Sequence, residues 1–284
     1  MKSRSPNLAL LAFAIPFLVI LAPASAARAG WSLVWSDEFE GDALDGSNWN
    51  IEVGDGCPEL CGFGNNELQW YGASNVQVRD GHLVLTARRE RIGDHHFTSG
   101  KITTEGKQSF LYGRIEARAK LPTGEGMWPA FWMLPEEDVY GGWAASGEID
   151  IVESIHETDH VSGTLHFGGH WPENTLSGGE YSPGLDFADD FHVYAIEWEP
   201  DEIRWYVDGV LYSRKTTEDW YSTAAPDEPR APFDQAFHLI LNTAVGGDYP
   251  GCTSPKCITA VLPQEFLIDY VRVYEDVPPT GPKR

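Results

Sequence analysis

The sequence predicts an all-β fold in which two antiparallel sheets pack face to face as a sandwich. Apolar and polar residues alternate from end to end, and no sustained helical periodicity occurs. The clearest alternation, in residues 114–121, places Ile and Ala side chains on one face and charged side chains on the other. Tight-turn signals separate many of the short strand patterns, which favours a sandwich over a helical or mixed fold.

Two Asp-Gly pairs mark expected hairpin turns. Asp80-Gly81 and Asp208-Gly209 each lie between two short segments with strand composition. Asp-Gly favours a two-residue turn in which both residues adopt positive φ, so the flanking segments are expected to pair as antiparallel neighbours.

The N-terminal segment has the pattern of a secretory signal peptide. Lys2 and Arg4 precede an apolar run over residues 8–22, followed by small residues suited to cleavage near residues 26–29. The run is shorter than the about 20 residues that a membrane-spanning helix needs. We therefore expect a signal peptide over residues 1–29 and a secreted protein, extracellular or periplasmic, that is not held in a membrane.

The remaining chain is predicted to form one domain. It has no internal repeat and no linker rich in Ser, Pro or Gly. The expected domain covers residues 30–276, a short C-terminal tail covers residues 277–284, and a monomer is the expected state.

The net charge of the chain limits the classes of partner that it is expected to bind. The formal net charge is −23, and loss of residues 1–29, which hold three basic and no acidic residues, makes it −26. This charge opposes nucleic acid, anionic membrane surfaces and sulfated or uronic-acid polymers, but not a neutral polysaccharide. The need to keep an exported protein soluble explains this negative charge equally well.

The four cysteines form two local pairs, Cys57/Cys61 and Cys252/Cys257. An even number in an exported protein favours disulfides, and of the three possible pairings we favour the two local ones. Zinc or another transition metal is disfavoured, because no His or Cys cluster has ligand spacing.

The most informative segment, residues 147–153, carries three acids among β-branched residues. In a regular strand Glu148 and Asp150 share one face and Glu153 takes the other, so one set would be buried at a large desolvation cost. A β-bulge near residues 151–152 would return Glu153 to the face of the other two. Three carboxylates on one face repel, so at least one is expected to retain a proton near neutral pH.

Such a set suits glycoside hydrolysis with retention of configuration. One ionised carboxylate acts as nucleophile and one protonated carboxyl group donates to the leaving oxygen. Asp150, between the two glutamates, can hold the nucleophile by a hydrogen bond. A solvated acidic face or a calcium site remains an alternative for the same three acids.

Residues 148–153 resemble the signature of glycoside hydrolase family 16, in the bulged form that laminarinases share with agarases and carrageenases. The family's lichenases and plant xyloglucan enzymes generally have one residue fewer before the last Glu. Matching segments follow in order along nearly all of the mature chain, at residues 64–69, 112–118, 128–134, 163–166, 242–247 and 269–274.

The resemblance implies a concanavalin-like β-jelly-roll with a concave substrate cleft. It also implies an endo-acting β-1,3-glucanase of the laminarinase type that acts on neutral β-glucan without a catalytic cofactor. Glu148 would be the nucleophile, Asp150 its helper and Glu153 the acid/base. The chain departs from the family at Trp143-Ala144, where Trp-Pro is often found.

Aromatic residues are expected to bind sugar rings, whose flat apolar faces pack on aromatic side chains. Trp128 and Trp132 share a strand face opposite Phe131 and Met133, so one pair should face the core and the other the cleft. Strand aromatics are more often core, but the resemblance favours the cleft for the two tryptophans.

Other cleft residues rest on the resemblance as well. It places Trp143 and His166 in the cleft. His166 follows Glu153 by thirteen residues, so it is expected on the adjacent strand if residues 156–160 form the connection. Trp171, in a polar loop, is a further candidate at the border of the cleft. Hydroxyl binding is expected from polar residues that could equally cap turns, namely Asn66, Glu67 and Asn242.

Many family members carry a structural calcium on the convex side. The matching positions are Glu38, the carbonyl of Gly81, and Asp269, and such oxygen ligands suit a hard cation. The sequence alone would not bring these three together, so calcium is an expectation from the resemblance.

Other functions stay open. A non-catalytic β-glucan-binding module would keep the fold but lose the acids, whereas Glu148 and Glu153 are both present. The same chemistry could act on mixed-linkage β-glucan or agar-type galactan, although residues 128–134 and 242–247 favour a laminarinase. A lectin-like sandwich with calcium would bind glucan without turning it over.

Overall fold

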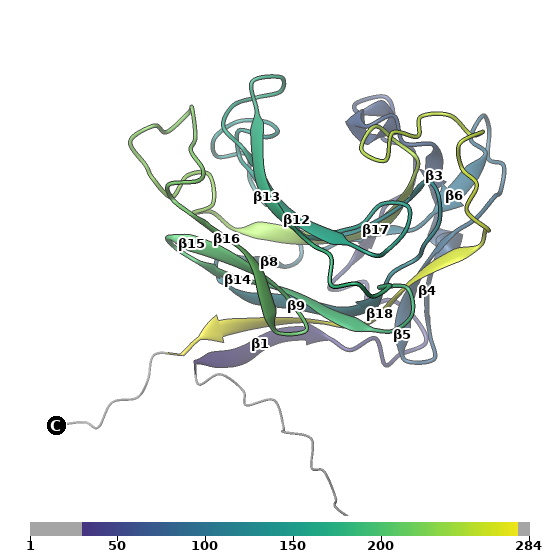
Figure 1. The fold of residues 1–284 in the computed structure, drawn as a ribbon, viewed down its shortest axis with the longest axis horizontal. Helices are drawn as coiled ribbons and strands as arrows, with labels where there is room; N and C mark the ends of the chain where they lie inside the picture. Colours follow the sequence, from purple (N-terminus) through teal and green to yellow (C-terminus); the bar gives the residue numbers. More distant parts are fainter. Residues whose placement is uncertain (1–29, 278–284) are drawn as a thin grey trace, which may run out of the picture.

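The computed structural model describes residues 30–277 and confirms the predicted sandwich of two antiparallel sheets (Figure 1). The expected signal peptide, residues 1–29, and residues 278–284 of the expected tail lie outside the described residues. Within the described part, no helix has the length and apolar character needed to cross a membrane. Its helical elements are two short 3-10 turns, Cys61–Gly64 and Ala73–Asn75.

One sheet forms the lower, convex layer of Figure 1, and we call it the convex sheet. Its strand order is β16-β15-β14-β9-β18-β5-β4, with β1 paired to β18. The strands are β1 (Trp31–Asp37), β4 (Val76–Arg79), β5 (His82–Ala87), β9 (Gly113–Lys120), β14 (His192–Glu199), β15 (Glu202–Val207), β16 (Val210–Thr216) and β18 (Gln264–Asp276).

The other sheet curves upward at its ends in Figure 1, and we call it the concave sheet. Its order is β13-β12-β11-β10-β17-β7-β2, with β8 paired to β17. The strands are β2 (Asn50–Ile51), β7 (Lys101–Thr103), β8 (Ser109–Phe110), β10 (Met127–Pro135), β11 (Glu148–Glu153), β12 (Val161–Phe167), β13 (Thr175–Tyr181) and β17 (Phe237–Val245). A small parallel pair, β3 (Gln69–Tyr71) and β6 (Phe97–Ser99), lies beside them.

The core fills the space between the two sheets. The alternation in β9 is confirmed, because Ile115, Ala117 and Ala119 are buried there. Large aromatic side chains from both sheets meet in this layer, and burying one of them contributes roughly 1.5–3 kcal/mol of hydrophobic stabilisation. They include Phe131 and Phe237 from the concave sheet and Tyr194, Trp198, Trp205 and Phe266 from the convex sheet.

The predicted hairpins are confirmed. Asp80 and Gly81 join β4 to β5 with φ of 54° and 75°, and Asp208 and Gly209 join β15 to β16 with φ of 49° and 78°. Positive φ at both central residues is the geometry that favours Asp-Gly.

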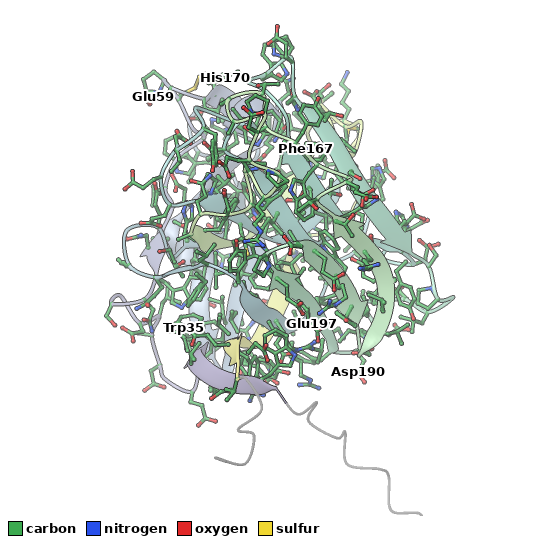
Figure 2. The ribbon with its side chains drawn as sticks, turned by 90° about the vertical axis from the view of Figure 1, so that its left-hand side faces the viewer. Trp35, Glu59, Phe167, His170, Asp190 and Glu197 are labelled. Atoms are coloured by element: carbon green, nitrogen blue, oxygen red, sulfur yellow. A yellow bond between two sulfur atoms is a disulfide. The ribbon has the colours of Figure 1, made fainter. Side chains whose placement is uncertain are left out.

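Both favoured disulfides are confirmed. Cys57 bonds to Cys61 and Cys252 bonds to Cys257. Each closes a short local loop rather than joining the sheets. In Figure 2, Glu59 inside the first loop and His170 after β12 lie at the same end of the molecule, opposite Trp35 and Glu197. Loops from both edges of the concave sheet therefore rise on its open side.

Candidate active site

The acidic strand β11 contains the predicted bulge. β11 pairs with β12 at Asp150–Thr164 and at Glu153–Ser162, so β11 has one more residue than its partner over this stretch. The register between β11 and β10 shifts at the same place. The bulge lets β11 bury its aliphatic residues in the core while its three acids share the open face.

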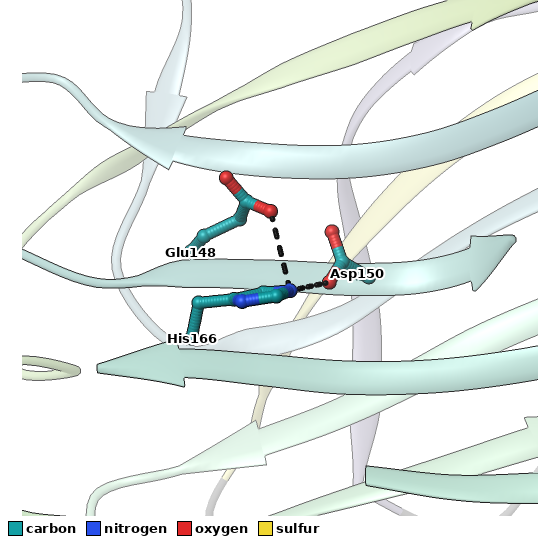
Figure 3. Close-up of side chains that lie close together, drawn as sticks. All are labelled: Glu148, Asp150 and His166. Carbon is teal, nitrogen blue, oxygen red and sulfur yellow. Dashed lines mark ion pairs between the residues drawn. The ribbon is translucent and has the colours of Figure 1, made fainter. Parts of the chain in front are cut away.

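His166 lies between two of these acids, as Figure 3 shows. It stands on β12 directly opposite Glu148, which confirms the predicted neighbouring strand. Its Nε2 lies 3.3 Å from Oδ2 of Asp150 and 3.6 Å from Oε1 of Glu148. Burial disfavours the imidazolium, but the interaction with Asp150 and the charge of Glu148 outweigh burial and raise the pKa of His166 to about 10.

The ligand atoms of Glu148, Asp150 and His166 lie within 4.8 Å of one another, a spacing that could also hold a metal ion. A protonated imidazole cannot coordinate a metal, because both ring nitrogens carry hydrogen. With its raised pKa, His166 holds that proton at neutral pH. His166 is therefore an imidazolium placed between the carboxyl groups of Glu148 and Asp150, and a metal ion there would have to displace its proton.

Glu153 and Asp150 are the carboxyl groups whose protons are held most strongly in this cluster. Burial and the charge of Glu148 raise the pKa of Glu153 to about 7, against the hydrogen bond that Nε1 of Trp128 donates to its Oε1 at 2.9 Å. Asp150 is 2% exposed. Burial, then the charges of Glu153 and Glu148, raise its pKa well above the usual range. The site can therefore hold a proton near neutral pH.

The predicted orientation of the β10 aromatics is confirmed. Phe131 and Met133 are fully buried in the core, whereas Trp128 and Trp132 are half-buried on the open face. Nε1 of Trp132 donates to Oδ1 of Asn242 at 2.7 Å. The two indoles thus flank the floor of the concave face, each fixed by one hydrogen bond.

Trp143 stands directly beside Glu148. Its Nε1 donates to Oε2 of Glu148 at 2.7 Å, and its ring centroid lies 5.7 Å from that of His166. Trp143 is 42% exposed, so its ring remains open to a ligand. Trp171, 71% exposed, is joined to it through a backbone hydrogen bond to the Trp143 carbonyl.

The three residues predicted to bind sugar hydroxyls differ in the partners that their polar atoms already have within the protein. Nδ2 of Asn242 donates to the Tyr71 hydroxyl at 3.0 Å, so its amide is used within the protein on both sides. Glu67 accepts from Gln69 at 2.6 Å, and burial raises its pKa. Asn66 is exposed and bonds the carboxylate of Asp248.

Sequence reasoning missed residues that complete this face. The Tyr249 ring packs edge-on against Trp128 at 5.4 Å. The ammonium of Lys101 lies 4.4 Å from the Phe63 ring and 5.7 Å from the Trp132 ring. A cavity of about 490 Å³ extends from Lys101 to Trp143. The alternation of a strand cannot distinguish a lysine over a cleft from one in solvent, so no sequence signal would have found it.

The expected calcium ligands lie on the convex side, and their carboxylates are engaged by arginines. Arg272 donates to both oxygens of Glu38 at 2.9 and 2.8 Å, and Arg118 donates to Asp269 at 2.7 Å. Gly81 lies in the β4–β5 turn. A cation bound here would have to displace or share these guanidinium contacts, so calcium stays a prediction.

Comparison with known proteins connects this geometry to a family. Residues 64–243 match the model of the glycosyl hydrolases family 16. The chain is 49% identical over 269 residues to glucan endo-1,3-beta-glucosidase A1 of Niallia circulans, covering 89% of this chain but only 39% of that relative. It is 43% identical over 254 residues to a beta-glucanase of Rhodothermus marinus, covering 86% of this chain and 85% of the relative.

A solved structure agrees with these matches. The laminarinase catalytic domain of Thermotoga maritima superposes with a TM-score of 0.77 at 41% identity, over 88% of this chain and all of that one. The glycosidases of the family need no cofactor for catalysis. Family model, relatives and fold agree, and the chain belongs to the glycosyl hydrolases family 16.

Proposed function

We propose that this protein is a secreted endo-glycosidase that hydrolyses internal β-1,3-glucosidic bonds of laminarin-like β-glucans with retention of configuration. The observation that carries the proposal is the bulged strand β11, which places Glu148, Asp150 and Glu153 on one open face. The glucanase names of the similar proteins support the substrate class. Secretion rests on the sequence pattern of residues 1–29.

In the first step Glu148 attacks the anomeric carbon while Glu153 protonates the departing glycosidic oxygen. A pKa of about 7 suits Glu153 to this role, because it retains a proton near neutral pH and can still lose it. In the second step Glu153, now ionised, takes a proton from water. The water attacks the glycosyl-enzyme and releases Glu148, so two inversions give net retention.

The neighbours of Glu148 orient its carboxylate for attack. The Trp143 N–H bonds one carboxylate oxygen, and the imidazolium of His166 lies close to the other. Together the two contacts hold both carboxylate oxygens in place. Asp150 anchors His166 from the opposite side and so keeps that charge in place.

Substrate binding is assigned to the aromatic side chains of the open face. Trp128, Trp132 and Trp143 can pack on pyranose faces while ring-edge polar groups take hydroxyls. Asn242 would serve by holding Trp132 in place. Asn66 and Glu67 remain proposed hydroxyl binders at the edge of this face.

The test is reducing-sugar release from laminarin, curdlan, lichenan, agarose and carrageenan side by side, with Glu153→Gln as the inactive control. We expect laminarin to be the best substrate and to yield short oligosaccharides rather than glucose alone. Equal or greater turnover of agarose or carrageenan would refute the specificity. Binding of laminarin with no turnover by the unaltered protein would make it a glucan-binding module instead.

A further inference from the structure

A hydrogen bond across the core connects the bulge of β11 to the opposite sheet. Nε1 of Trp205, on β15 of the convex sheet, donates to the backbone carbonyl of Asp150 at 2.8 Å. Trp205 is 0% exposed. Asp150 is the last residue before the bulge that pairs in regular register with β12. The indole therefore contacts β11 at the point where the bulge changes which side chains point to the open face.

The neighbouring strand β12 leaves room for this indole by having a glycine. Gly163 lies between the partners of Asp150 and Glu153, directly beside the bulge. A Cβ on Gly163 would lie 2.5 Å from Nε1 of Trp205 and 2.7 Å from Oη of Tyr212. Both distances are too short for real atoms, so any larger residue would push the indole away from the Asp150 carbonyl.

We propose that Trp205 is a positioning residue for the catalytic carboxylates, which it serves by fixing the β11 bulge through the Asp150 carbonyl, with Gly163 providing the space. The inference rests on the proposed roles of Glu148 and Glu153. In a strand, a shift of one residue turns each following side chain to the other face. The position of the bulge therefore decides whether Glu153 shares a face with Glu148.

Loss of this bond would affect the chemical step more than substrate binding. The indole rings proposed to hold the glucan belong to β10 and to the segment before β11, whereas the Trp205 N–H bonds the backbone of β11 and none of these rings. Trp205 lies behind β11, on its core side. A displacement of Glu153 relative to Glu148 should thus lower kcat, while KM stays close to the wild-type value.

The experiment compares Trp205→Phe with Trp198→Phe. Trp198 is a matched control, because it is 1% exposed, belongs to the same sheet and donates its Nε1 to a buried carbonyl, that of Phe233, at 3.2 Å. Both variants lose one indole donor and part of a buried ring, so both should lower the melting temperature. Only Trp205→Phe should lower kcat on laminarin, by about 10- to 100-fold, as expected for a displaced catalytic group.

A wild-type kcat in both variants, or the same loss of kcat in both, would overturn the inference. If Trp205→Phe does not fold, 3-benzothienylalanine at position 205 keeps the bicyclic shape and replaces the N–H with sulfur. A wild-type kcat with that residue would also overturn it. If the unaltered protein hydrolyses no glucan, the proposed function fails. Hydrolysis with an unchanged kcat in Trp205→Phe refutes the positioning role alone.

Discussion

The two sheets each carry buried carboxylates, but they neutralise them differently. On the convex sheet, Arg114 bonds Glu116 at 2.9 Å and Glu197 at 3.4 Å. Arg204 adds a bond to Glu197 at 2.9 Å. On the concave sheet, the cation that forms ion pairs with Glu148 and Asp150 is an imidazolium.

The proton affinities of the two clusters differ accordingly. Burial opposes ionisation of Glu197, but hydrogen bonds from Tyr206 and Arg204 outweigh it and lower the pKa. For Glu153 and Asp150, burial and like charges raise the pKa instead. Buried glutamates alone do not identify an active site. The partners decide whether a carboxyl group is a fixed charge or a group that exchanges protons.

The largest expected effect is the loss of activity in Glu148→Gln. Removal of the proposed nucleophile should lower kcat on laminarin by about 10⁴-fold or more. Glu197→Gln, in the arginine-paired cluster, should lower stability and leave the kcat of the folded protein near wild type. Steady-state kinetics with a thermal melt of each variant separates the two. A comparable loss of kcat in Glu197→Gln would abolish the distinction between the clusters.

A large stability effect is expected from Arg204→Met. Glu197 would lose that guanidinium but keep Arg114 and the Tyr206 hydroxyl, so the loss should be about 1–3 kcal/mol of unfolding free energy. The control is Arg230→Met, whose ion pair with Asp201 is exposed and screened by solvent, so its loss should lower the unfolding free energy much less. Urea unfolding measures both. Equal losses in the two variants would show that burial of the pair has no bearing on its strength.

The pH dependence of activity should report Glu153. The proposed proton donor must be protonated, so kcat/KM should fall as pH rises through about 7. The positive charge of His166 lowers the pKa of Glu153, so His166→Gln should move that midpoint to higher pH. The half-buried His160, paired with the exposed Asp159, supplies the control His160→Gln. A midpoint that moves to lower pH in His166→Gln would contradict the electrostatic account.

The smallest effect concerns calcium. If Glu38, Gly81 and Asp269 hold the ion, chelation should lower the melting temperature more than it lowers activity in the cold, because a ligand of the native state stabilises by mass action. The sites lie on the convex side, away from β11. An unchanged melting temperature after exhaustive chelation would count against the site, and would fit the arginine contacts of both carboxylates.

Much of the catalytic strand was predictable, because burial restricts its possible arrangements. Alternation left Glu153 on the wrong face, and only a bulge could repair that without burying a charge. Alternation also placed Trp128 and Trp132 on the face opposite Phe131 and Met133, and the resemblance to the family then favoured the cleft for the two tryptophans. The contacts that residues from distant segments make with these side chains and with β11 could not be predicted in this way. The contact of Tyr249 with Trp128 and the bond from Trp205 to Asp150 depend on how distant segments approach, which no local pattern encodes.

The division of labour between Glu148 and Glu153 is tested most directly by azide rescue on an aryl β-glucoside with a good leaving group. In Glu153→Gln the first step needs little protonation, and azide should attack the glycosyl-enzyme and give a β-glycosyl azide. Glu148→Gln should give little retained product. A β-glycosyl azide from Glu148→Gln with none from Glu153→Gln, or an α-configured first product from the unaltered enzyme, would contradict the account.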